Sequence, residues 1–161
     1  MWWIDLATKQ TKLWIDLTDE VQNAGDRGLI GVVTHPNFAQ NPYVFLSLTV
    51  DPIYGQPDEP ENYAAIERLI RLTDNNGVTS DSTRLTLFGS TAADAVYICF
   101  NTHALGQIRF GLDGSLIITT GEGAHWDIPA GDYGQNYVPT DVQCDNLFVD
   151  PREDVGAFKV C

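Results

Sequence analysis

The sequence has few cysteines, few basic residues and no long apolar run, and each shortage argues against a class of protein. The three cysteines, Cys99, Cys144 and Cys161, are an odd number, and no Cys-x-x-Cys or His-x-x-x-His spacing suggests a zinc or haem site. No apolar stretch reaches the length of a membrane-spanning helix. Nine Lys and Arg against 22 Asp and Glu give a formal net charge of −13. This charge argues against nucleic acid or an anionic membrane as a partner, because their phosphates would be repelled.

What the sequence has is one strand pattern after another. Hydrophobic residues make up 43% of the chain and aromatic residues 11%, as in a globular protein. Asn76-Gly77 and Asp113-Gly114 mark turns. Residues 66–72 also fit a helical face, but their length and neighbours favour a strand. An all-β fold is therefore predicted, with strands at residues 2–6, 12–17, 29–34, 43–49, 66–72, 84–88, 107–110 and 116–120.

Residues 102–123 are the most informative segment. They predict a hairpin whose strands, 107–110 and 116–120, are joined by a tight Asp113-Gly114 turn, since the central residues of such a turn need positive φ. His103 lies just before the first strand, where a strand end would present it to a cavity. A neutral imidazole held there can act as a general base. The plain alternative, a loop or packing histidine, is the commoner role for a single histidine.

Two blocks of the sequence carry a family resemblance. The first is RGLIGVVTHPNF, residues 27–38, followed by NPYVFL, residues 41–46. The second runs from His103 through FGLDG, residues 110–114, to GEG, residues 121–123. In this order they resemble the signature of the glucose/sorbosone dehydrogenase-like family, the soluble quinoprotein sugar dehydrogenases and their relatives. The resemblance implies a β-propeller, six-bladed in the full protein.

An internal repeat and the chain length agree with a propeller. Gly31 and Gly106 each open a strand that is followed by a polar turn and a return strand. Repeated strand units without helices favour a propeller over a sandwich. A blade takes roughly 40–50 residues and a six-bladed ring upward of roughly 250. With 161 residues, we expect two to three blades, so that residues 1–161 are a fragment of a single propeller domain.

The resemblance implies a quinoprotein that oxidises an aldose or a related sugar alcohol at its anomeric hydroxyl. Pyrroloquinoline quinone (PQQ) accepts the hydride in that family, and calcium polarises the quinone. His103 matches the family's base, and Asp26 falls where the family has a quinone contact, although a turn aspartate explains Asp26 equally well. His125 and Trp126 are candidate substrate residues on a pocket rim, where an ordinary surface loop is at least as good an interpretation. The metal ligands stay unassigned, and an extracellular or periplasmic location is expected.

Three positions depart from the family pattern. Thr102 stands where glucose dehydrogenases have Asp, and a hydroxyl cannot stabilise an imidazolium as a carboxylate does. Ala104 and Gln107 replace the family's Asn and Arg. These departures favour an alternative, a non-catalytic propeller of the same lineage that binds a carbohydrate or a protein ligand, as in hedgehog-interacting proteins. A third interpretation, a calcium-dependent lactonase-type propeller, needs inward-facing Asn, Asp and Glu ligands from several blades.

Overall fold

The computed structural model describes residues 1–51, 65–91, 94–98 and 102–121. These residues form strands and one short 3-10 turn, η1 (Asp81–Thr83), and contain no α-helix. The predicted all-β class is therefore confirmed. In chain order the strands are β1 (Trp2–Ile4), β2 (Thr11–Leu13), β3 (Leu29–Thr34), β4 (Tyr43–Val50), β5 (Ala65–Thr73), β6 (Leu85–Phe88), β7 (Val96–Ile98), β8 (Leu105–Phe110) and β9 (Leu116–Thr120).

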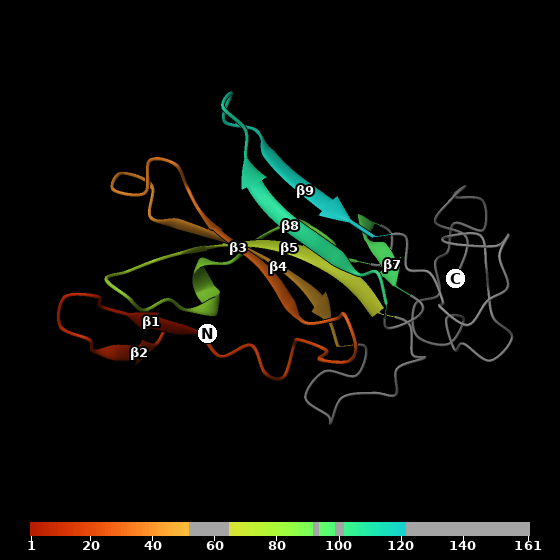
Figure 1. Ribbon diagram of the computed structural model, residues 1–161, viewed down its shortest axis with the longest axis horizontal. Helices are drawn as coiled ribbons and strands as arrows, with labels where there is room; N and C mark the ends of the chain where they lie inside the picture. Colours follow the sequence, from red (N-terminus) through yellow and green to blue (C-terminus); the bar gives the residue numbers. More distant parts are fainter. Residues whose placement is uncertain (52–64, 92–93, 99–101, 122–161) are drawn as a thin grey trace, which may run out of the picture.

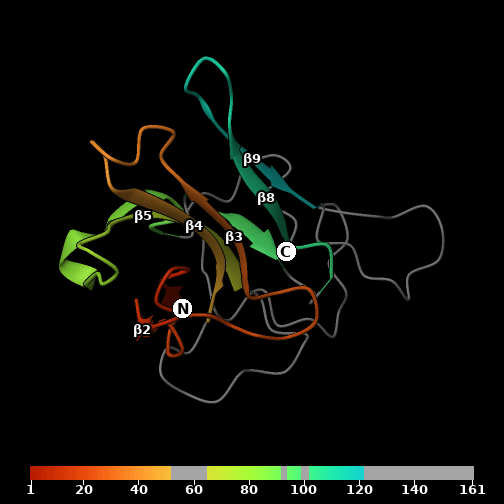
Figure 2. The same cartoon turned by 60° about the vertical axis from the view of Figure 1, so that its left-hand side comes forward.

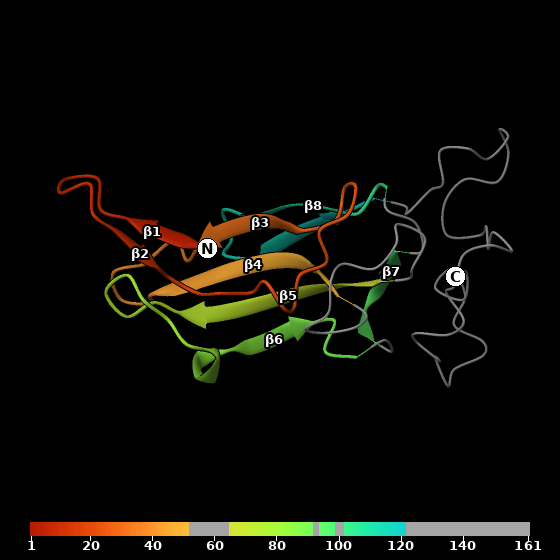
Figure 3. The ribbon, with the colours of Figure 1, turned by 90° about the horizontal axis from the view of Figure 1, so that it is seen from below.

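The central sheet is an antiparallel meander in the order β3-β4-β5-β6, so that strands adjacent in the chain are adjacent in space. Figure 3 shows these four strands side by side. Strand β7 pairs with the first residues of β5, whereas β6 pairs with residues 69–71 farther along the same strand. Because β6 and β7 share one edge of β5, the loop between them must leave that edge and return to it.

The core lies on both faces of β4 and β5. On one face, Leu46, Leu48 and Ile70 pack with Trp14, Ile15 and Leu17 of the N-terminal segment. On the other face, Phe45 and Leu69 pack against Ile108 of β8. Alternate residues of a strand point to opposite faces, so a strand that is apolar at nearly every position is covered on both sides. Burying each such side chain contributes roughly 1.5–3 kcal/mol.

The β8–β9 hairpin lies against β3 and β4 (Figure 1 and Figure 2). Its connection is a three-residue loop, because Gly114 N donates to Gly111 O at 3.1 Å and Gly111 N donates to Ser115 O at 2.7 Å. Gly114 has a φ of 84°, whereas Asp113 does not have a positive φ. The predicted hairpin with its Asp113-Gly114 turn is thus confirmed, but of these two residues only Gly114 has the expected positive φ. The loop is a type I turn closed by a left-handed glycine, and the Asp113 carboxylate caps Ser115 N at 3.0 Å.

The hairpins β3–β4 and β8–β9 share a local design. In each, the first strand has a bulge or irregularity at its glycine, between Leu29 and Gly31 in one and between Leu105 and Ile108 in the other. A Cβ on Gly31 would collide with the Ser47 hydroxyl, and a Cβ on Gly106 with the Thr119 hydroxyl. Both glycines thus leave room for a close cross-strand contact with a hydroxyl side chain. The repeat read from the sequence is confirmed as two similar hairpins packed against each other.

Candidate functional site

His103 lies in the turn that leads into β8, two residues before the strand begins. It is exposed, and its φ of 54° places a residue with a Cβ in the left-handed region. This conformation costs roughly 1–2 kcal/mol outside glycine. The end of β9 closes on the same turn, because Gly121 N donates to Ala104 O at 2.9 Å. A Cβ on Gly121 would overlap the His103 carbonyl group, so only glycine fits there.

Asp26 reaches the same turn from the loop before β3. Its Oδ2 accepts a hydrogen bond from His103 N at 3.0 Å. Arg27, only 2% exposed, fixes that loop by donating from Nη2 to Ile98 O at 2.7 Å and from Nη1 to Gln22 Oε1. The structure therefore brings together two candidate residues that are 77 positions apart. The contact joins a carboxylate to the histidine backbone.

Two of the three departing positions have side chains engaged in other contacts. Ala104 is buried in an apolar cluster with Val96 and Ile98. Gln107 is exposed, and its Oε1 accepts hydrogen bonds from Arg109 Nε at 3.2 Å and Nη2 at 2.9 Å. Where the family pattern has an asparagine after the histidine, this chain thus has a methyl group in the core.

A buried acid beneath the hairpin was missed in the sequence. Glu67 is fully buried, and Thr120 Oγ1 donates to its Oε2 at 2.8 Å. Its Oε1 has no hydrogen-bond partner, and neither does the hydroxyl of Thr49, its direct neighbour across the β4–β5 ladder. Burial raises the pKa of the Glu67 carboxyl to about 8, while the bond from Thr120 partly lowers it. A glutamate between the apolar residues of a two-sided strand is the signal that could have revealed it.

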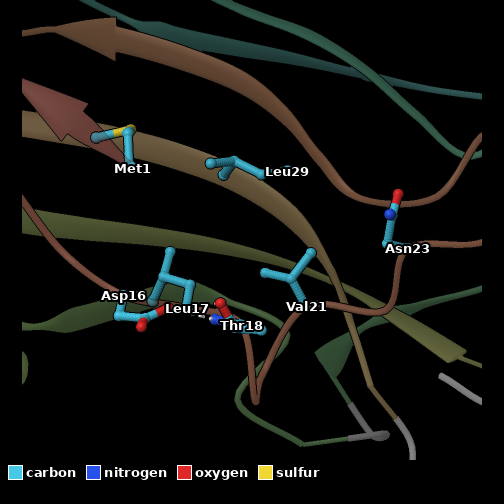
Figure 4. A pocket seen from close by; sticks show the side chains of 7 residues that line it. All are labelled: Met1, Asp16, Leu17, Thr18, Val21, Asn23 and Leu29. Carbon is cyan, nitrogen blue, oxygen red and sulfur yellow. Dashed lines mark hydrogen bonds between the residues drawn. The ribbon is translucent and has the colours of Figure 1, made fainter. Parts of the chain in front are cut away.

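Two hollows lined by described residues do not include His103 in their lining. Figure 4 shows one of ≈ 320 Å³, lined by Met1, Asp16, Leu17, Thr18, Val21, Asn23 and Leu29. A groove of ≈ 410 Å³ separates residues 30–33 of β3 from residues 107–109 of β8. His35 packs its ring against Tyr43 and Phe110, and its Nδ1 accepts a bond from Asn37 N at 3.1 Å. These contacts give His35 a packing role.

Among residues 1–51, 65–91, 94–98 and 102–121, no group of three or more His, Cys, Asp or Glu side chains could hold a metal ion. No helix in these ranges is long and apolar enough to cross a membrane. The candidate substrate residues His125 and Trp126 lie outside the described residues.

Fold and site together define an all-β protein with repeated, bulged hairpins and a strained histidine where one of them begins. Residues 1–137 match the family model for glucose/sorbosone dehydrogenase, and the chain belongs to that family of oxidoreductases. It is 26% identical over 133 residues to the HIPL1 protein of Arabidopsis thaliana, covering 68% of this chain and 19% of that protein. It also resembles the crystal structure of a candidate oxidoreductase (glucose dehydrogenase) of Thermus thermophilus. That match has 26% identity and a TM-score of 0.46, and covers 71% of this chain and 29% of the other. The chain thus spans a minor part of both relatives.

Proposed function

We propose that the whole protein is a quinoprotein sugar dehydrogenase that oxidises an aldose or a related sugar alcohol at its anomeric hydroxyl. The observation that carries the proposal is the His103 turn, held by Asp26 and Gly121 within the segment that bears the family signature. Backbone strain kept by surrounding contacts is typical of functional sites. Membership of the glucose/sorbosone dehydrogenase family supports the substrate class.

The architecture proposed for the whole protein is a six-bladed β-propeller, with residues 1–161 as part of its single domain. The four-stranded meander β3-β4-β5-β6 has the strand order of one blade. The β8–β9 hairpin repeats the bulged design of β3–β4 and packs against it, as the inner strands of the next blade would. An extracellular or periplasmic location completes the proposal.

In the proposed reaction, a neutral His103 imidazole takes the proton of the anomeric hydroxyl while a hydride leaves the same carbon, and the sugar becomes a lactone. An imidazole suits this step because its ordinary pKa lies close to neutral pH. PQQ, when bound with calcium, supplies the two-electron acceptor. His125 and Trp126 are the proposed sugar contacts. The aromatic ring of Trp126 can pack against the C–H face of a sugar.

The described residues alone do not fit PQQ or calcium. Calcium needs several oxygen ligands, and no cluster of three or more His, Cys, Asp or Glu occurs in the described part. A quinone with three carboxylates needs cationic partners, but Asp26 puts a carboxylate beside His103 and Arg27 is buried beneath. The step assigned to described residues is therefore proton transfer to His103.

The test is dye-linked oxidation of a panel of aldoses by the purified protein supplied with PQQ and calcium. His103→Ala is expected to lower turnover by at least about a hundredfold, the usual scale of general-base catalysis. The matched control is His35→Ala, which removes the packing histidine and should leave turnover unchanged. A wild-type protein that binds quinone but oxidises no aldose, or that binds no quinone, would contradict the proposal.

The second candidate function is a non-catalytic propeller that binds a carbohydrate or protein ligand. Ala104 favours it, because its buried methyl group replaces the family's polar residue after the histidine. Gln107 favours it too, since its side-chain oxygen is engaged by Arg109. Calorimetric binding of oligosaccharides without any oxidation would support this candidate over the dehydrogenase.

A further inference from the structure

We propose that Asp26 is a positioning residue for His103: its carboxylate holds the histidine backbone in the turn that presents the imidazole. This inference rests on the proposed function and assigns Asp26 a role other than the quinone contact expected from the sequence. The carrying observation is the hydrogen bond from His103 N to Asp26 Oδ2 at 3.0 Å, which joins the entrances of β3 and β8.

Asp26 lies on a loop whose position is fixed by buried contacts. The next residue, Arg27, is 2% exposed and crosses to β7, where its Nη2 donates to Ile98 O at 2.7 Å. Gln22, which accepts from Arg27 Nη1, is itself fully buried. Arg27 N also closes the loop by donating to Ala24 O at 3.0 Å. A carboxylate on a loop anchored by a buried guanidinium has a defined position.

The positive φ of His103 requires a stabilising contact. In the repeat, Gly28 lies three residues before the bulge glycine Gly31, and His103 lies three residues before Gly106. Gly28 has a φ of 141° and His103 a φ of 54°, so both copies use positive φ at this point. Glycine adopts such angles without strain, but histidine does not. A charged acceptor on the histidine N–H can offset that strain, since such bonds are stronger than neutral ones.

The turn is also confined on the side of the His103 carbonyl group. Gly121 lies so close that a Cβ on it would be 2.6 Å from the His103 carbonyl carbon and 3.0 Å from its Cα. Ala104, the residue after His103, is fixed in the apolar cluster that contains Ile98, the residue whose carbonyl binds Arg27. Gly121 and the apolar cluster thus confine the turn on its carbonyl side. Asp26 holds it on the opposite side, at the N–H group of His103.

The experiment compares Asp26→Ala and Asp26→Asn in the whole protein. We would measure hydrogen–deuterium exchange of the His103 amide, kcat and KM for an aldose, and the Kd for PQQ. Asp26→Ala should speed exchange of that amide about tenfold or more, since the lost bond is charge-assisted. It should lower kcat about ten- to a hundredfold, the effect of a misplaced catalytic group, and leave the Kd for PQQ unchanged. Asp26→Asn keeps an acceptor oxygen without the charge, so its amide exchange and kcat should lie between those of Asp26→Ala and the wild type, nearer the wild type.

The matched control is Asp113→Ala, which removes a carboxylate that caps a backbone N–H at the far end of the same hairpin. It should leave the His103 amide and kcat unchanged. Unaltered exchange in Asp26→Ala would overturn the proposal. So would an Asp26→Asn protein as impaired as Asp26→Ala with weaker PQQ binding, because that pattern marks a cofactor contact. If His103→Ala keeps full turnover while Asp26→Ala still speeds exchange, the proposed function fails and the backbone contact stands.

Discussion

Replacing Glu67 with glutamine is expected to stabilise the protein at neutral and alkaline pH. The carboxyl lies fully buried between the central sheet and the β8–β9 hairpin, with Thr120 donating to Oε2 at 2.8 Å and Oε1 unpartnered. A charge in that position would be desolvated without a counter-charge. Glutamine keeps an oxygen that can accept from Thr120, carries no charge, and adds an amide donor near the unpartnered Thr49 hydroxyl.

The size and sign follow from the pKa of Glu67, which burial raises from its ordinary 4.5 to about 8. A change of one in pKa corresponds to about 1.4 kcal/mol, so the raised pKa of Glu67 corresponds to on the order of 5 kcal/mol of stability at most. The folded protein holds the proton over a pH range in which the unfolded chain has released it. The stability that the folded protein has with Glu67 protonated is therefore fully present below about pH 4.5. It is lost progressively between pH 4.5 and about 8, as deprotonation favours the unfolded chain, and the loss is complete above that range.

The assay is urea unfolding followed by tryptophan fluorescence at several values between pH 4.5 and 9. Glu67→Gln should match the wild type at pH 4.5 and exceed it by a few kcal/mol at pH 8–9. Asp19→Asn, the same substitution of acid by amide at an exposed acid, controls for the change in net charge and should follow the wild-type profile. Parallel stability–pH curves for Glu67→Gln and the wild type would refute the reasoning.

Two further predictions concern contacts around the site and the sheet. Glu20 is buried between Arg68, at 2.9 Å, and Arg84, at 2.6 Å, so Glu20→Ala should destabilise the protein by about 3–5 kcal/mol in urea unfolding. Burial raises the pKa of Glu20, but the bonds from Arg84 and Arg68 outweigh it and lower the pKa below 4.5. This ion pair should therefore weaken as the pH falls below 4.5, a loss that Glu20→Gln should abolish. Gly121→Ala should drive a methyl group into the His103 carbonyl, cost about 1–3 kcal/mol in thermal unfolding, and reduce sugar oxidation; an unchanged melting temperature would contradict the close contact.

Local pattern was enough to locate most of the strands. A strand overlaps each of the eight predicted regions, and the ambiguous segment 66–72 falls within β5. Its helix-like spacing arose because Ile66 and Ile70 face one layer and Leu69 the other, which makes both faces apolar. The region 12–17 forms a strand only to Leu13, since the chain then places Trp14, Ile15 and Leu17 in the core instead of continuing the ladder. Strand β7 (Val96–Ile98) was not among the predicted regions.

The geometry around His103 was less accessible to sequence reasoning. The motif placed His103 at a strand entrance, and the structure agrees. The contact with Asp26 spans 77 positions and depends on how two hairpins pack, which no local pattern encodes. Glu67 was overlooked because a glutamate in a strand is usually solvent-facing, and only its burial from both sides reveals its strain.

The junction between the two similar hairpins gathers the residues that break local rules. Non-glycine residues with positive φ also occur at Lys9 and at Asn76, and Asn76 is in an Asn-Gly turn, where such angles are ordinary. His103 is different, because it replaces the glycine of the first copy with a side chain that has chemistry to offer. Arg27 is buried on one side of it, and the uncompensated Glu67 lies under the hairpin that follows it. Departures from local consistency are expected at functional sites. Their gathering here supports the proposal that the entrance of β8 is the functional site of the described part of the chain.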